Sequence, residues 1–128
     1  METQGRLKRI SVDGAPDAVM LHGGSILFRH YTISLHAIDR FVERCDRPAA
    51  DILPMLHNAV LACLERAKRA GIKRVIRVAQ ERGGYVLFCE TCYFVVVPDP
   101  KTGSHVVTTV MTPRYMRNGN PAIRGSNE

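Results

Sequence analysis

The stretch ISLHAIDRFVER, residues 33–44, decides where the first helix of this chain begins and which side of it is polar. Apolar side chains recur there at three- and four-residue spacing, at Leu35, Ile38, Phe41, Val42 and Cys45. This period is typical of one buried helix face. Ser34 stands where a serine would cap the first turn. We therefore predict a helix over residues 35–46.

Three basic or titratable side chains, His36, Arg40 and Arg44, follow one edge of this helix at four-residue spacing, where like charges repel. An imidazole titrates at about pH 6.5, so it can accept or donate a proton near neutrality. Guanidinium groups one and two turns further on can bind a phosphate through forked hydrogen bonds. Together these groups could supply the chemistry of RNA cleavage through the 2′-hydroxyl. From the spacing alone, a solvated face on which Arg40 pairs with Glu43 is the simpler interpretation.

The length of 128 residues indicates a single domain over 1–113, followed by an irregular tail over 114–128 that is rich in Asn, Gly, Pro and Arg. Eighteen Lys and Arg against twelve Asp and Glu leave a net charge of +6 and a pI near 9.5, which suits a polyanionic partner. No signal peptide or membrane-spanning run is recognisable. We expect a cytoplasmic protein with reduced thiols and no membrane partner.

Hydropathy and turn signals outline the rest of the chain. They predict a β-hairpin region over 1–32, a second helix between Asp51 and Gly71, and strands over 73–80, 85–89, 92–97 and 105–111. Because the links between these strands are short, we expect them to pair as an antiparallel meander. The predicted fold class is α+β. Two helices pack on a four-stranded antiparallel meander as two layers, preceded by one or two short β-hairpins.

The last strand carries the remaining candidates for the cleft. Strict alternation would place His105, Val107, Thr109 and Met111 on one face, and Val106, Thr108 and Val110 on the other. Thr108 lies between two valines that look like core, so Thr109 is the preferred cleft residue. A threonine in a strand is also simply a good β-former.

Together, the pattern S-x-H-A-I-x-R-F-x-E-R, the second helix and the closing strand V-V-T-T-V-M resemble small toxin-like domains of the barnase, colicin and RelE superfamily of metal-independent ribonucleases. The resemblance covers residues 33–113. It implies an active site of His36, Arg40 and either Thr108 or Thr109, with no metal and no cofactor. It also implies an RNA substrate, and a host protein or cognate inhibitor as a further partner of a bacterial or phage toxin.

Four further side chains are expected to bind substrate: Arg44, Arg77, His105 and Tyr115. Arg77 belongs to a basic run that could follow a phosphate backbone, whose other members are Arg66, Lys68, Arg69, Lys73 and Arg74. The same run could equally be a solvated surface. Tyrosines offer stacking surfaces, but with 6% aromatic residues no dedicated single-strand platform is visible.

Two other functions stay open. The pair Cys89-x-x-Cys92 has the spacing of half a zinc site, with Cys45, His36 or His105 as conceivable further ligands. Without a second such pair, small packed side chains are the simpler interpretation. The chain could also be a non-catalytic interaction protein, such as a phage or mobile-element factor that binds a host protein or nucleic acid through its basic face.

Overall fold

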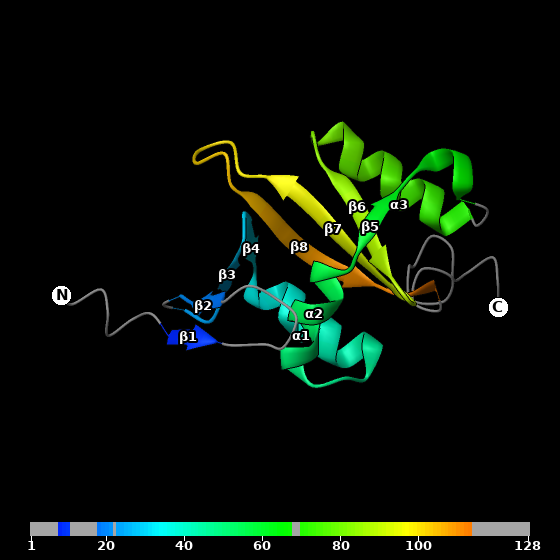
Figure 1. Cartoon of the computed structure of the whole chain (residues 1–128). Coiled ribbons are helices and arrows are strands. Elements are labelled where there is room, and N and C mark those ends of the chain that lie inside the picture. Colours follow the sequence, from blue (N-terminus) through cyan, green and yellow to red (C-terminus); the bar gives the residue numbers. More distant parts are fainter. Residues whose placement is uncertain (1–7, 11–17, 22, 68–69, 114–128) are drawn as a thin grey trace.

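The computed structural model describes residues 8–10, 18–21, 23–67 and 70–113 (Figure 1). Within them the strands are β1 (Lys8–Ile10), β2 (Ala18–Met20), β3 (Ile26–Phe28), β4 (Tyr31–Ile33), β5 (Val60–Ala62), β6 (Tyr85–Cys89), β7 (Cys92–Pro98) and β8 (His105–Met111). The α-helices are α1 (Leu35–Cys45), α2 (Ile52–His57) and α3 (Ala70–Glu81). Single 3₁₀ turns occupy Ala49–Asp51 and Leu64–Arg66.

All described strands belong to one mixed sheet of eight strands, in the order β1-β2-β3-β4-β8-β7-β6-β5. The predicted four-stranded meander is therefore wrong. Neighbours pair antiparallel except β4 and β8, which are parallel, with Tyr31 opposite His105 and Ile33 opposite Val107. The short links between β6, β7 and β8 do enforce antiparallel pairing. β4 is remote from β8 in sequence, and so it was free to join in either direction.

Residues 73–80, predicted as the first strand of the meander, lie in α3. The apolar positions that pack are Ile72, Val75, Ile76 and Ala79, whose spacing is helical rather than alternating. Gly83, with a φ of +80°, ends this helix. The amides of Gly83 and Gly84 donate to the carbonyls of Gln80 and Ala79, as in a glycine-terminated helix. This glycine pair therefore ends a helix, and it is not a short link between two strands of the predicted meander.

The second predicted helix is also wrong in extent. α2 ends at His57, and the chain then forms β5 at the edge of the sheet, antiparallel to β6. Val60 and Leu61, which lie inside the range of the predicted helix, are 56% and 61% exposed. The segment forms a strand because it pairs with β6, which lies far along the chain. This pairing outweighs the helical pattern of the local sequence.

Helices cover both faces of the sheet (Figure 1). One core lies between the sheet and the pair α1 and α2, with Phe28, Phe41 and Phe94 fully buried in it. A smaller core lies under α3 on the opposite face, around Ile76 and Val86. The expected arrangement of two helices in a single layer is thus wrong, because residues 73–80 supply a third helix for the other face.

The first helix agrees with its prediction. Ser34 has extended backbone angles, and its hydroxyl accepts a hydrogen bond of 3.0 Å from the amide of Ala37, which confirms the N-cap. Asp46 ends the helix with a φ of 55° and donates its amide to the carbonyl of Val42. Among the described residues, no helix has the length and apolar character needed to cross a membrane.

Candidate functional site

The helix α1 runs along the edge of β8 and is attached to it at both ends. At its start, the amide and the hydroxyl of Ser34 donate to the carbonyl of Val107 at 3.2 and 3.0 Å, and the hydroxyl also lies 3.4 Å from the carbonyl of Thr108. At its end, Nη1 of Arg44 donates to the carbonyl of Val110 at 2.9 Å. β4 pairs with β8 only as far as Val107. Beyond this residue, the edge of β8 is bonded to α1 instead, through the carbonyl of Val110.

The environment of the three side chains explains how the row tolerates its like charges. Arg44 is half-buried and turned to a strand carbonyl. Nε of Arg40 lies 3.1 Å from Oε1 of Glu43, although this buried N–H is not aligned as a hydrogen bond. The Arg40 side chain is 30% exposed and that of Glu43 61% exposed. A carboxylate and a carbonyl dipole thus offset the repulsion.

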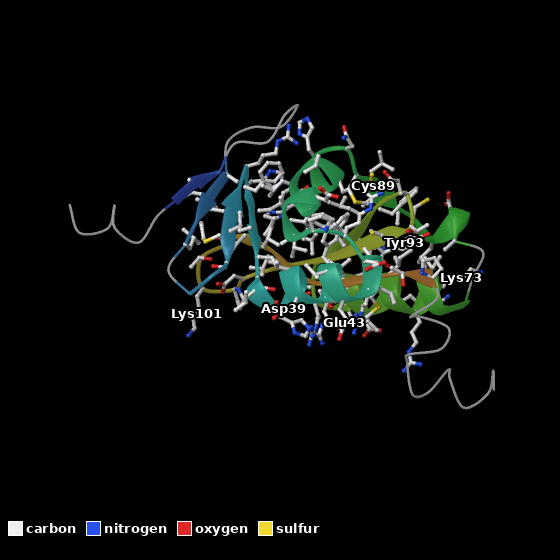
Figure 2. All side chains as sticks on the ribbon, turned by 90° about the horizontal axis from the view of Figure 1, so that it is seen from below. Asp39, Glu43, Lys73, Cys89, Tyr93 and Lys101 are labelled. Atoms are coloured by element: carbon white, nitrogen blue, oxygen red, sulfur yellow. The ribbon has the colours of Figure 1, made fainter. Side chains whose placement is uncertain are left out.

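His36 is the open member of this row. It is exposed and makes no hydrogen bond or ion pair with the part of the chain that the structure describes. The labelled side chains of Asp39 and Glu43 lie along the outer side of the same helix (Figure 2). The imidazole of His36 is therefore available to a ligand, while neighbouring carboxylates limit the positive potential around it.

The last strand contains an irregularity that the sequence pattern did not reveal. The register shifts between Val95 and Val96, so that Val95 lies opposite Thr109 and Val96 opposite Val107. Thr108 is the inserted residue, and its hydroxyl donates to the carbonyl of Val95 at 3.3 Å. Strict alternation is consequently wrong here, since a bulge inverts the facing of every residue beyond it.

This bulge determines on which face of the sheet each threonine side chain lies. Thr109 shares a face with its partner Val95, which packs against the core under α3. Val107 and Val110 are buried in the core under α1 and α2. α1 is bonded to β8 through Ser34 at its start and Arg44 at its end. Arg40, one turn before Arg44, therefore lies level with Thr108 and Thr109 along the length of the strand. Among the described residues, no hydrogen bond joins His36 or Arg40 to either threonine.

His105 lies within an aromatic cluster at the start of β8. Its Nδ1 is 2.7 Å from the hydroxyl of Tyr85, and its ring centroid is 5.3 Å from that of His30. His30 in turn lies 4.1 Å from the ring of Tyr31. Burial, and to a lesser extent the hydroxyl of Tyr31, raise the pKa of Tyr85 to about 12. Tyr85 therefore keeps its proton at neutral pH and can donate it to His105.

The other two predicted substrate contacts are separate from this edge. Arg77 is exposed on α3, not on a strand, where it lines an open hollow of about 330 Å³ with Lys73, Arg74, Val78 and Glu81. The basic side chains around this hollow form a surface on α3, which covers the face of the sheet opposite to α1 and α2. Tyr115 lies outside the described residues.

The cysteines gather without forming a metal centre. Cys45, at the end of α1, packs against the core that contains Cys92, and Cys89 lies opposite Cys92 across the β6–β7 turn. Over the described ranges, no group of three or more His, Cys, Asp or Glu side chains is arranged to hold a metal ion. The conceivable ligand His105 is engaged with Tyr85 instead.

No family model, curated protein or solved structure matches this chain. The resemblance to the ribonuclease superfamily therefore stays an expectation from sequence.

Two parts of the site escaped sequence reasoning. The aromatic cluster combines side chains from β4, β6, β8 and the β3–β4 turn, and nothing in the local sequence links His30 to His105. The structural use of Arg44 was missed because the acceptor is a main-chain carbonyl 66 residues away. The ion pair between Arg40 and Glu43 could be predicted from the sequence, because the two residues lie three positions apart on the same helix.

Proposed function

We propose that the edge formed by α1 and β8 binds the phosphodiester backbone of RNA and cleaves it without a metal. The observation that carries this proposal is that His36 is exposed, has no hydrogen-bond or ion-pair partner among the described residues, and lies on a helix held to β8 at both ends. A fixed helix presents the imidazole at a constant position, which proton transfer in a transition state requires. The resemblance in sequence names the same residue.

The reaction assigns one task to each available group. In the first step His36 acts as the base that takes the proton of the 2′-hydroxyl, whose oxygen attacks the adjacent phosphorus. The bond from phosphorus to the 5′-oxygen breaks, this oxygen takes a proton from water as it leaves, and a 2′,3′-cyclic phosphate remains. Arg40 stabilises the charge that develops on phosphate. Its pairing with the exposed carboxylate of Glu43 is weak enough to be exchanged for a phosphate.

Two residues of the predicted site change their assignment. Arg44 already donates to the carbonyl of Val110, so we assign it to positioning α1 and not to substrate. Thr109 shares the face of its partner Val95, which packs under α3 and away from α1, and the hydroxyl of Thr108 donates to the carbonyl of Val95, so we assign neither threonine to RNA. A cytoplasmic site of action, as a bacterial or phage toxin restrained by an inhibitor protein, belongs to the same proposal.

The test is cleavage of single-stranded RNA oligonucleotides by the purified chain in the presence of EDTA. We expect His36→Ala to lower the rate by at least about 100-fold and Arg40→Ala by a similar order. Lys101→Ala on the β7–β8 loop is the control and should retain the parent rate. An oligonucleotide with 2′-deoxyribose at the scissile position should resist cleavage. Equal rates for the parent and His36→Ala would exclude this mechanism.

A second function, non-catalytic binding of nucleic acid, is favoured by the basic surface on α3. Lys73, Arg74 and Arg77 are all exposed around one hollow. If this surface binds RNA through phosphates, replacing all three by alanine should weaken binding and lower the slope of log affinity against log salt by about 2. His36→Ala should leave that affinity unchanged. This pattern, in a parent that does not cleave RNA, would favour binding over catalysis.

A further inference from the structure

The strand β5 forms one edge of the sheet. It is last in the strand order and, among the described residues, pairs only with β6. The N–H and C=O groups on its outer side can therefore bind a further strand. Val60 and Leu61 in this strand are 56% and 61% exposed, the highest fractions of any large apolar side chain that the structure describes. This edge thus offers both an open main chain and apolar side chains.

The same edge lacks the charges that usually prevent edge strands from pairing with another chain. Residues 58–64 read NAVLACL and contain no Lys, Arg, Asp, Glu or His. At the opposite edge of the sheet, β1 reads KRI and carries two positive charges in three residues. Charged side chains, Lys above all, protect an edge because a second strand would have to approach them closely. β5 is therefore the unprotected edge of this sheet.

The side chains of β5 continue both faces of the sheet. Ala62 stands opposite Val86, which packs under α3, and Val60 lies on the same face because alternate residues of a strand point the same way. Leu61 stands opposite Leu87, which belongs to the core under α1 and α2. An open groove of about 650 Å³ adjoins the strand, and its lining includes Ile72, Phe88 and Tyr93. A further strand at this edge would bury apolar side chains on both faces.

We propose that β5 pairs antiparallel with β5 of a second copy of this chain, so that two sheets join about a two-fold axis. The axis passes beside Leu61, which lies opposite the same residue of the other copy, and Val60 of each copy lies opposite Ala62 of the other. A second copy fits because an uncharged apolar strand is complementary to itself. The assembly closes at two copies, since the same edge serves both. Pairing of β5 with β1 would be open-ended, and the charges of β1 oppose it.

The contact is small, and each copy carries a net charge of +6. Edges of three residues bury less than the roughly 800 Å² per partner of a standard interface, so we expect a dissociation constant on the order of 10–100 µM. Salt screens the repulsion between the copies and should tighten the dimer, whereas it weakens binding to phosphates. Antiparallel pairing also leaves both α3 helices on the same side of the joined sheet. This inference is independent of the proposed activity.

The first experiment is sedimentation equilibrium of the full chain at concentrations from about 1 to 500 µM, a range that brackets the expected dissociation constant. We expect an average mass that rises from 14.3 kDa and approaches twice this value. Raising NaCl from about 0.05 to 0.5 M should tighten the dimer severalfold. A monomer at every concentration would overturn the proposal and leave the edge to a strand of another protein. A mass that keeps rising would overturn it too, because it indicates open-ended assembly.

Two matched variants locate the contact at β5. Leu61→Lys places a charge on the edge and should keep the chain monomeric. Its circular dichroism should match that of the parent, because Leu61 is exposed. Leu27→Lys changes a 42% exposed leucine of β3, a strand that is paired on both sides, and should dimerise as the parent does. A dimer that survives Leu61→Lys would contradict pairing through β5.

A cross-link tests the register of the two strands. In a Cys63→Ser background, Leu61→Cys brings two thiols together across the two-fold axis, where the Cα atoms of an antiparallel pair lie about 4.5–5.5 Å apart and within reach of a disulfide. With oxidised glutathione as the oxidant, this variant should give a covalent dimer on a non-reducing gel. Leu27→Cys in the same background should run as a monomer. If Leu61→Cys forms no covalent dimer, the proposed pairing is wrong.

Discussion

The hydroxyl of Tyr85 lies 2.7 Å from Nδ1 of His105, although β7 runs between the strands that carry them. The contact therefore crosses one strand of the sheet and ties β6 to the start of β8. Since Tyr31 stands opposite His105 on β4, the cluster also spans the one parallel pairing of the sheet. The hydrogen bond thus ties β6 to β8, and the ring contact between His105 and His30 connects this pair to the β3–β4 turn.

The first prediction concerns the ionisation of Tyr85. Burial and the neighbouring Tyr31 raise its pKa from 10.0 to about 12. Between these two pH values the folded chain keeps this proton and the unfolded chain loses it. Tyr85 therefore contributes stability that is fully present below pH 10 and declines as the pH rises towards 12. Comparing the urea midpoints of the parent and Tyr85→Phe across this range should show the parent losing its advantage. A constant difference would contradict it.

The second prediction contrasts two arginines one turn apart on α1. Arg44→Met removes the donor to the carbonyl of Val110 and should lower the free energy of unfolding by about 1–3 kcal/mol. Arg40→Met removes only a partly exposed ion pair with Glu43 and should cost less than about 1 kcal/mol. Both replacements keep an unbranched side chain on the helix. Urea unfolding of both variants measures the contrast, and equal losses would show that the strand contact contributes nothing.

The third prediction concerns Ser34, which caps α1 and also bonds to β8. Ser34→Ala removes the acceptor for the amide of Ala37 and the donor to the carbonyl of Val107. We expect a loss of about 1–2 kcal/mol in the free energy of unfolding. Ser25→Ala, whose side chain lies before β3 and carries no comparable contact, serves as the control. Faster hydrogen exchange in the first turn of α1 should accompany the loss. Unchanged protection there would argue against the double role.

The fourth prediction uses the glycine between α3 and β6. A methyl group on Gly84 would overlap the carbonyl oxygen of Val96 on β7. Because this contact is with main chain, the strands must move apart, and Gly84→Ala should cost at least about 2 kcal/mol. Gly103→Ala is the matched control, since its φ is +77° but its added methyl group meets only open space. That variant should lose about 1 kcal/mol. Thermal unfolding of the two variants ranks them.

Local sequence alone determined the elements whose stabilising contacts are short in range. Ser34 and the period of Ile38 and Phe41 were sufficient for α1, because a helix satisfies its hydrogen bonds within its own segment. The strands β6, β7 and β8 lie within one residue of their predicted bounds. They form consecutive antiparallel pairs, so each finds its partner across a short connection.

Only the tertiary structure decided the features that depend on distant partners. The segment around Val60 left its predicted helix to pair with β6. The helical spacing of Ile72, Ile76 and Ala79, by contrast, is local, so the strand predicted over 73–80 was a wrong interpretation of the sequence itself. The bulge at Thr108 reversed the face of Thr109, which no alternation rule can anticipate. The partners of Arg44 and His105 were likewise set by packing between segments far apart in sequence. These outcomes are properties of the assembled sheet, because the energies that favour them exist only once its strands have met.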